Sequence, residues 1–308
     1  LLWVAGNLDV YGRGAELVEK FLRVESNATA INRVTNHYGK AVEEPLQEPT
    51  TALPVAPQEV VYAELDGGMI FTDEQWREVK LGRVFRSEDI RQSATIRRGG
   101  EILHSEYTAH LGGHAEFSEK FRLSLDKYIP LADRLGFLRD GAQWVDQWSA
   151  QEYPLATQIL DFYHVVEHLG EFAKLAIADS QARDRWYAEQ KALLLAGRAT
   201  TVIENIERYK SAGTNIKEQA EKLQGYYRAN QGHMRYDEYI RRGLDIGSGA
   251  IESAHRTVVH RRMKLSGQRW ANTGAQNVLN LRAASMSDKW GLVIDLIKRP
   301  QIKQTVQN

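Results

Sequence analysis

The chain has no cysteine among its 308 residues, which excludes disulfide bonds and metal sites built on thiolates. No apolar run approaches the ~18 residues of a membrane-spanning helix, and we expect no signal peptide. Lys and Arg number 40, as do Asp and Glu, so the formal net charge is zero and no global field attracts the chain to a polyanion. The sequence therefore predicts a soluble, cytoplasmic protein, in which any affinity for a polyanion must come from local patches.

Proline is scarce and unevenly spread, since four of the seven prolines lie in EPLQEPTTALPVAPQE (44–59). Such a stretch predicts an extended linker between domains, and the chain length is compatible with two or three domains. Residues 1–43, before this linker, show helical periodicity. The chain begins within a pattern, LLWVAG, and we expect that an N-terminal part precedes it.

The N-terminal region is predicted to contain two short helices. The first, 14–24, places Leu17, Phe21 and Val24 on one face, and the second spans 28–44 after a polar break. Two such helices fit a helix-turn-helix, which binds DNA with its second helix, and equally an ordinary helical hairpin. Both interpretations stay open at this point.

After the linker the periodicity changes to that of strands. Residues 60–68, 78–85 and 101–112 each interleave polar and apolar side chains and predict an antiparallel meander. We expect the first strand to close in a turn at its Gly-Gly pair. The next elements are expected to be a helix at 115–135, ended or kinked by Pro130, a strand at 136–140, a helix at 142–151, a strand at 155–161 and a helix at 165–178.

Residues 179–242 show no strand pattern. Amphipathic helices are predicted at 183–197, 200–213 and 216–230, separated by glycines. The prediction is an α/β core formed by 60–178 and 243–308 and interrupted by an α-helical insertion.

Three acids share an unusual setting. Asp66 and Asp140 lie at the ends of the first and fourth expected strands, each before a glycine, and Glu252 lies in a helix after Gly-Ser-Gly. If those two strands are neighbours, the aspartates come close together, which is costly unless a cation lies between them. An all-oxygen site suits Mg²⁺ or Mn²⁺, and two ions about 3.5–4 Å apart can catalyse phosphodiester chemistry. The alternative is ordinary Asp-Gly turns and a plain helix start capped by Ser248 or Ser253.

A basic run follows Glu252. No acid occurs between Ser253 and Ser287, and Trp270 lies among the cations. The pattern indicates a surface for DNA phosphates, with the tryptophan able to stack on an unpaired or flipped base. The alternative is a solvated basic face with Trp270 in the core. The basic residues are Arg256, Arg261, Arg262, Lys264, Arg269 and Arg282.

The motifs LDGG…EVKLGRVF, RDGAQWV, DFYHVVEHL and GSGAIESAHRTVVHRRMKLSGQRWANTGAQNVLNLRA resemble insertion-sequence transposases with a DDE catalytic core, nearest the ISKra group. The resemblance covers roughly residues 60–285. It implies an RNase H-like mixed sheet with an α-helical insertion, and a metal-dependent enzyme that cuts transposon ends and joins them to target DNA. By motif position, Asp66, Asp140 and Glu252 correspond to the catalytic triad that binds two Mg²⁺ or Mn²⁺ ions.

The resemblance extends to further residues and partners. Asp161 and His164 in DFYH are typical of such proteins and would support the metal ligands or contact the scissile phosphate; a structural hydrogen bond is the alternative for His164. The N-terminal helices would belong to an end-recognition domain. The implied partners are transposon-end DNA, target DNA and a second copy of the chain, because synapsis of two ends usually needs at least a dimer.

Other functions remain open. HVVEH (164–168) fits the H-x-x-E-H signature of zinc proteases, with His164 and His168 as ligands and Glu167 as base. No convincing third ligand follows in the next helix. A structure-specific metal-dependent nuclease and an inactive DNA-binding derivative are further alternatives.

Overall fold

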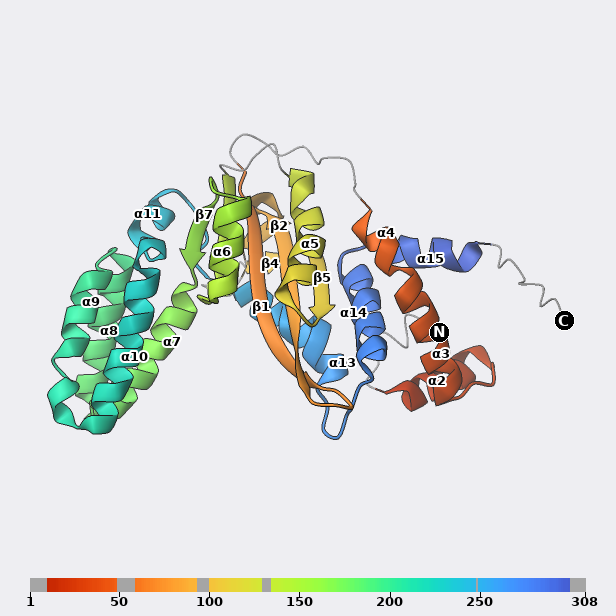
Figure 1. Cartoon of the computed structure of the whole chain (residues 1–308), viewed down its shortest axis with the longest axis horizontal. Coiled ribbons are helices and arrows are strands. Elements are labelled where there is room, and N and C mark those ends of the chain that lie inside the picture. The colour runs from red at the N-terminus through yellow and green to blue at the C-terminus, as the bar shows by residue number, and fades with distance from the viewer. Residues whose placement is uncertain (1–9, 49–58, 93–99, 129–133, 248, 300–308) are drawn as a thin grey trace. The chain divides into compact units, whose positions relative to one another are not determined.

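The computed structural model describes residues 10–48, 59–92, 100–128, 134–247 and 249–299. Five strands form one mixed sheet in the order β5-β2-β1-β6-β7, and β3 and β4 form a second, two-stranded sheet (Figure 1). Together with many helices, these sheets confirm the predicted α/β class. The chain divides into two compact units: the first comprises 1–57, 65–130 and 251–308, and the second comprises 58–64 and 131–250.

In the first unit the sheet contains β2 (Trp76–Arg86) and β5 (Glu106–Leu111), which pair antiparallel with Gly82 opposite Thr108. Helix α5 (His114–Leu125) packs on these two strands. A Cβ at Gly82 would lie 2.4 Å from the Phe121 ring, so the glycine lets the helix approach the sheet closely.

Strand β1 (Val61–Phe71) differs from the expected 60–68, because it does not end at Gly67 and Gly68. The turn comes later, where the Thr72 N–H donates to the Gln75 carbonyl at 2.9 Å. Asp66 therefore lies within a strand rather than at its end. The two glycines serve close packing rather than a turn.

The expected strand at 101–112 is also wrong as a single element. It is split into β4 (Gly100–Ile102), which pairs with β3 (Ile90–Gln92), and β5 in the main sheet. The helix expected at 115–135 ends at Leu125, and Pro130 lies outside the described residues. A hydropathy pattern does not reveal a change of pairing partner, which is why the split was not predictable.

The N-terminal region forms α2 (Tyr11–Leu22), α3 (Ala28–Ala41) and the short α4 (Glu43–Gln47). The linker expected at 44–59 thus begins as helix, and 49–58 lie outside the described residues. Phe21 and Val24 are exposed, whereas Ala15 and Val18 are buried against Ile31 of α3. The small side chains, not the large ones, form the contact between α2 and α3.

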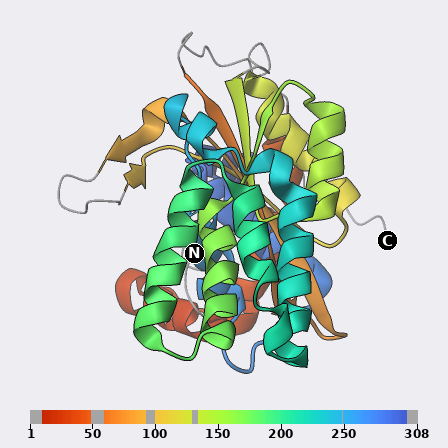
Figure 2. The same ribbon diagram turned by 90° about the vertical axis from the view of Figure 1, so that its left-hand side faces the viewer.

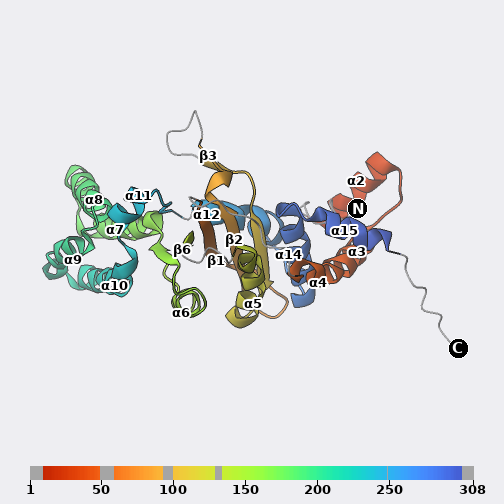
Figure 3. The same cartoon turned by 90° about the horizontal axis from the view of Figure 1, so that it is seen from above.

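Helix α3 packs on α14 (Asn272–Met286), and α15 (Trp290–Lys298) lies beside both (Figure 3). Gly39 permits this approach, since its missing Cβ would lie 2.3 Å from the Asn277 carbonyl oxygen. Amide side chains of α14 complete the contact: Asn280 Nδ2 donates to the Gly39 carbonyl at 3.0 Å, and Asn277 Nδ2 donates to Asn36 Oδ1 at 3.0 Å.

In the second unit, the first residues of β1 pair parallel with β6 (Leu135–Arg139), which pairs parallel with β7 (Thr157–Leu160). Helix α6 (Gln143–Glu152) connects β6 to β7 and contributes Trp148, whose ring meets Phe137 edge-on at 5.9 Å. These elements agree closely with the predicted strand–helix–strand order.

The helical block forms α7 (Phe162–Ala176), α8 (Ser180–Leu195), α9 (Ala199–Glu207), α10 (Thr214–Asn230) and α11 (Tyr236–Arg241). Residues 179–242 are all described and contain no strand, as the periodicity predicts. Helices α7 to α10 run side by side (Figure 2). The two ends of the block meet, because the Phe162 N–H donates to the Ile246 carbonyl at 2.8 Å. The chain leaving the block is also tied to β1, since the Asp245 N–H donates to the Tyr62 hydroxyl at 2.9 Å.

Within the described ranges, no helix combines the length and the apolar character needed to cross a membrane.

Replacement of Gly39 by Ala should destabilise the protein by about 1–3 kcal/mol, because the new methyl group meets backbone atoms of Asn277 that have no rotamer to change. Gly225→Ala on α10 is the matched control: its Cβ would meet no described atom within 4 Å, and it should stabilise by about 0.5–1 kcal/mol. Urea unfolding midpoints measure both effects. Equal stability of Gly39→Ala and wild type would contradict the packing described.

Candidate functional site

The surroundings of Asp66 are built on a close approach to β1. A Cβ at Gly67 would lie 2.2 Å from Glu78 Oε1, and a Cβ at Gly68 would lie 2.4 Å from Cε1 of His255. Asp66 Oδ1 accepts the Gly67 N–H at 2.7 Å, and Oδ2 lies 3.9 Å from His255 Nε2. The two glycines after Asp66 therefore make room for a glutamate on β2 and a histidine ring.

His255 belongs to the helical segment that carries Glu252. Helix α12 (Gly249–Ala254) continues into the π-helix η5 (His255–His260) and then into α13 (Arg261–Met263). π-Helical turns are rare and occur frequently at functional sites. Val258 and Val259 anchor this segment in the same apolar core as Ile70 of β1.

The first unit thus brings Asp66 next to the helix that carries Glu252, with His255 as the contact. Glu252 precedes this histidine by three residues, about one helical turn. Sequence reasoning missed His255, although its spacing from Glu252 was visible. Glu78 was missed as well, since its position beside Gly67 depends on the pairing of β1 with β2.

Burial controls the protonation of His255. Its side chain is 4% exposed, and desolvation lowers its pKa to about 4, although a hydrogen bond to the Asp66 backbone acts in the opposite direction. The ring of His260 lies 5.4 Å away, and burial lowers its pKa as well. His255 is therefore neutral at pH 7 and places an uncharged imidazole beside the Asp66 carboxylate.

The basic residues after Glu252 separate into two groups. Arg262 is buried between two rings, with its guanidinium carbon 4.7 Å from the centroid of Tyr11 and 4.8 Å from that of Trp270. Trp270 is also buried, and its Nε1 donates to the Met263 carbonyl at 3.1 Å. The exposed group comprises Arg256, Arg261, Lys264 and Arg269.

Arg262 and Trp270 were both expected to contact DNA, and the structure instead places them in the core beside Tyr11 of α2. Trp270 thus corresponds to the alternative of a core residue, with its ring already in contact with a cation. Arg282 is buried too: it donates to the carbonyls of Thr257 and Val258, and burial lowers its pKa to about 10.

Asp140 lies in the second unit, directly after β6. It is exposed, its Oδ1 accepts the Ala142 N–H at 3.0 Å, and its carbonyl accepts the Tyr226 hydroxyl at 2.8 Å. Gly141 has φ +97°, and a Cβ there would lie 2.9 Å from the Tyr226 ring, so only glycine fits this turn. Burial raises the pKa of Tyr226, and the neighbouring carboxylates of Asp140 and Asp161 raise it further.

Asp161 follows β7 at the position next to Asp140. The last paired residues of β6 and β7 are Arg139 and Leu160, and the two aspartates come next along each strand. Asp161 is 1% exposed and caps α7, because its Oδ1 accepts the Tyr163 N–H at 2.7 Å. This aspartate therefore has a clear structural role at the start of α7.

Arg139, the residue directly before Asp140, is a buried cation. The Arg139 side chain is fully buried in an ion pair with Asp146 of α6, and burial lowers its pKa to about 10. The pair fixes α6 against the end of β6, directly before the exposed aspartate.

The HVVEH motif lies on α7. Nε2 of His164 and Nε2 of His168 are 3.1 Å apart, whereas Glu167 Oε2 lies 3.9 Å from His164 Nδ1, on the other edge of that ring. A zinc-hydrolase base would need its carboxylate on the Nε2 side, near the metal-bound water. Among the residues that the structure describes, no three or more His, Asp or Glu side chains are grouped to hold a metal ion.

No protein-family model matches the chain, and no curated protein matches it either.

The low pKa of His255 predicts an acid-sensitive contribution to stability. Between pH 6.5 and about 4 the unfolded chain binds a proton that the folded chain does not, so stability falls as pH falls through this window. The expected slope from this residue is about 1.4 kcal/mol per pH unit. In His255→Gln this component should be absent, which unfolding free energies measured at several pH values will test. Parallel curves for wild type and variant would contradict it.

Proposed function

We propose that the chain is a DNA transposase with an RNase H-like catalytic core, which cleaves transposon ends and joins their 3′ ends to target DNA. The mixed five-stranded sheet is compatible with such a core, and the helical block between β7 and α12 corresponds to the insertion that the motif resemblance implies. The N-terminal helices would take part in end recognition.

The observation that carries the proposal is the strand register. Glu64 of β1 pairs with Leu138 of β6, and the strands are parallel neighbours. Asp66 and Asp140 each follow a member of this pair by two residues. Since side chains two positions apart on a strand share a face of the sheet, this register supports our proposal that Asp66, within β1, and Asp140, directly after β6, act together.

The donor set fits hard divalent cations. Asp66, Asp140 and Glu252 offer carboxylate oxygens only, which Mg²⁺ and Mn²⁺ prefer. When bound, two such ions lower the barrier for attack on a phosphodiester by water or a 3′-hydroxyl. The carboxylates would hold the ions, and His255, uncharged at pH 7, would keep Asp66 oriented without neutralising it. No covalent protein–DNA bond is required.

The exposed basic residues after Glu252 would form the DNA-binding surface that the proposed function needs. Arg256 and Arg261 are exposed on the segment that continues α12, and Lys264 and Arg269 follow it. Such cations bind phosphates without reading the base sequence. We propose that they position DNA beside the carboxylates, in a complex of at least two copies of the chain that holds two transposon ends.

Asp66→Asn, Asp140→Asn and Glu252→Gln should each reduce cleavage and joining by about 10²–10³-fold or more while sparing DNA binding, because each removes a charged oxygen donor. The assay incubates labelled DNA carrying the ends of the encoding element with plasmid and Mg²⁺ or Mn²⁺. Asp73→Asn, an exposed acid in the turn after β1, is the control and should keep full activity.

The products distinguish the possible functions. Joined end–plasmid DNA identifies a transposase, cuts without joining identify a nuclease, and binding without cuts identifies an inactive DNA-binding derivative. Full activity in any of the three carboxylate variants would refute the assignment of that residue.

Substitution of neighbouring arginines should separate DNA contact from packing. Arg261→Ala should lower the salt dependence of DNA binding by about one phosphate contact and change stability by less than about 0.5 kcal/mol. Arg262→Ala should cost about 2 kcal/mol of stability, because it removes a buried cation from between Tyr11 and Trp270. Binding isotherms at several salt concentrations and urea unfolding measure the two effects. The reverse pattern would contradict the assignment.

A further inference from the structure

Two histidines on α7 form a pair that the proposed catalysis does not use. His164 and His168 lie one helical turn apart, with ring centroids separated by 4.4 Å and Nε2 atoms by 3.1 Å. Their side chains are 33% and 39% exposed, so solvent and small ions reach both rings. The two Nε2 atoms thus converge on one point at the helix surface.

The opposite edges of the two rings each face a carboxylate. Glu167 Oε2 lies 3.9 Å from His164 Nδ1, and Glu171 Oε2 lies 3.6 Å from His168 Nδ1. A carboxylate at Nδ1 favours the proton on that nitrogen and leaves the lone pair on Nε2. Metal-binding histidines commonly have a carboxylate at the outer ring nitrogen, which fixes the tautomer and the orientation of the ring.

The separation of the Nε2 atoms matches a shared cation. With metal–nitrogen bonds of about 2.0–2.1 Å, two ligands of a tetrahedral ion are about 3.3 Å apart, close to the 3.1 Å observed. Without an ion the 3.1 Å contact is a hydrogen bond, in which one Nε2–H donates to the other Nε2. When both rings carry the proton on Nδ1, a cation between the two lone pairs replaces that hydrogen bond. Imidazole nitrogen selects Zn²⁺, Cu²⁺ or Ni²⁺ rather than Mg²⁺.

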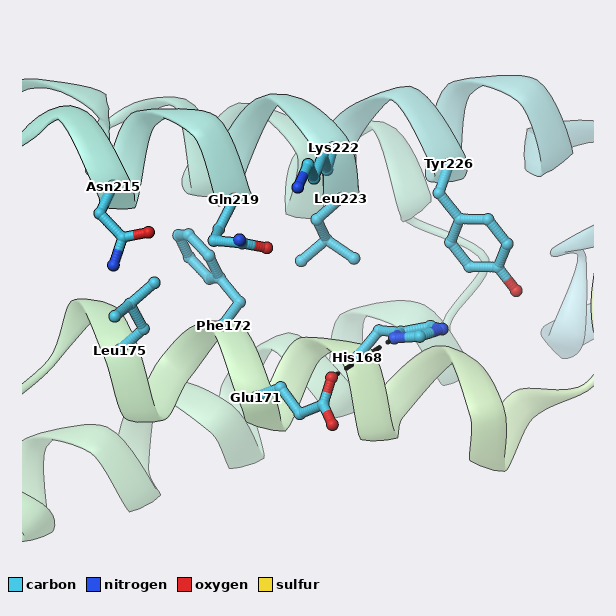
Figure 4. Close-up of a pocket in the computed structure, with 9 residues that line it drawn as sticks. All are labelled: His168, Glu171, Phe172, Leu175, Asn215, Gln219, Lys222, Leu223 and Tyr226. Atoms are coloured by element: carbon cyan, nitrogen blue, oxygen red, sulfur yellow. Dashed lines mark ion pairs between the residues drawn. The ribbon is translucent and has the colours of Figure 1, made fainter.

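The space beside His168 leaves room for further ligands of an ion. A cavity of about 640 Å³ between α7 and α10 is lined by His168, Glu171, Lys222 and Tyr226, among others. Figure 4 shows His168 projecting from α7 into this gap and Tyr226 descending from α10 beside it. In the described part of the chain no third His, Asp or Glu joins the pair, so water or an anion would fill the remaining positions of a bound ion.

We propose that His164 and His168 form a two-histidine chelate for a borderline divalent cation of the Zn²⁺ class, separate from the proposed Mg²⁺ site. The ion lies next to the contact that holds Asp140, because the Tyr226 ring is 5.4 Å from that of His168 and its hydroxyl donates to the Asp140 carbonyl. This site does not depend on the proposed function.

Calorimetric titration of the full chain with ZnCl₂, in buffer with excess MgCl₂ to saturate oxygen sites, tests the proposal. Wild type should bind one Zn²⁺ per chain, and His164→Ala and His168→Ala should each lower the affinity by at least about tenfold. Glu171→Gln should have a smaller effect, since it removes only an outer carboxylate. Asp66→Asn should bind Zn²⁺ like wild type, which separates this site from the proposed catalytic one.

His104→Ala is the matched control. His104 Nδ1 lies 3.7 Å from Asp288 Oδ2, and among the described residues no ring contact or hydrogen bond pairs it with another imidazole. This variant should bind Zn²⁺ like wild type. Unfolding midpoints of all variants without Zn²⁺ establish that each is folded.

Three results would overturn the chelate: no Zn²⁺ binding by folded wild type, undiminished binding in both His164→Ala and His168→Ala, or a loss in one of them alone. The readout is heat of binding and requires no DNA. Loss of transposition activity in other variants therefore has no bearing on it.

Discussion

The contact between Gly68 of β1 and the ring of His255 is the constraint on which the rest of the candidate site depends. A Cβ at Gly68 would lie 2.4 Å from that ring, so a glycine at this position lets the helical segment that carries His255 pack closely on β1. The approach sets the position of α12, buries His255 and holds its imidazole neutral beside Asp66. The role proposed for His255 beside Asp66 therefore depends on the glycine at position 68.

The hydropathy pattern of the sequence correctly predicted the elements that are determined by residues close together in the chain. The helices of 179–242 were visible because their periodicity and separating glycines are properties of the segment itself. Strands β6 and β7 were visible because short apolar runs end at Asp140 and Asp161. The turn expected at Gly67 and Gly68 was wrong, because glycine marks either a turn or a close contact and only the tertiary structure decides which.

The residues of the candidate site also divide into those that the sequence could predict and those that only the tertiary structure reveals. The acids could be selected from their chemistry and from motif resemblance, whereas His255 and Glu78 could not, since their roles arise from packing. Arg262 and Trp270 are similar: their burial depends on Tyr11, which lies about 250 residues earlier in the chain. A basic run in a sequence gives the number of cations but not the number that face solvent. Of the six here, Arg262 and Arg282 are buried.

The hydrogen bond between Phe162 and Ile246, with that between Asp245 and Tyr62, closes the base of the helical block. Because the first and last residues of the helical block lie next to each other, the roughly eighty residues between them form an insertion at a single point of the sheet. The free-energy cost of closing such an insertion depends only weakly on its length. Such a module can grow, shrink or be exchanged over evolutionary time at little cost to the strands beneath it. Sequence differences between related proteins would then be concentrated in the helical block, whereas the strands that flank it would tolerate little change.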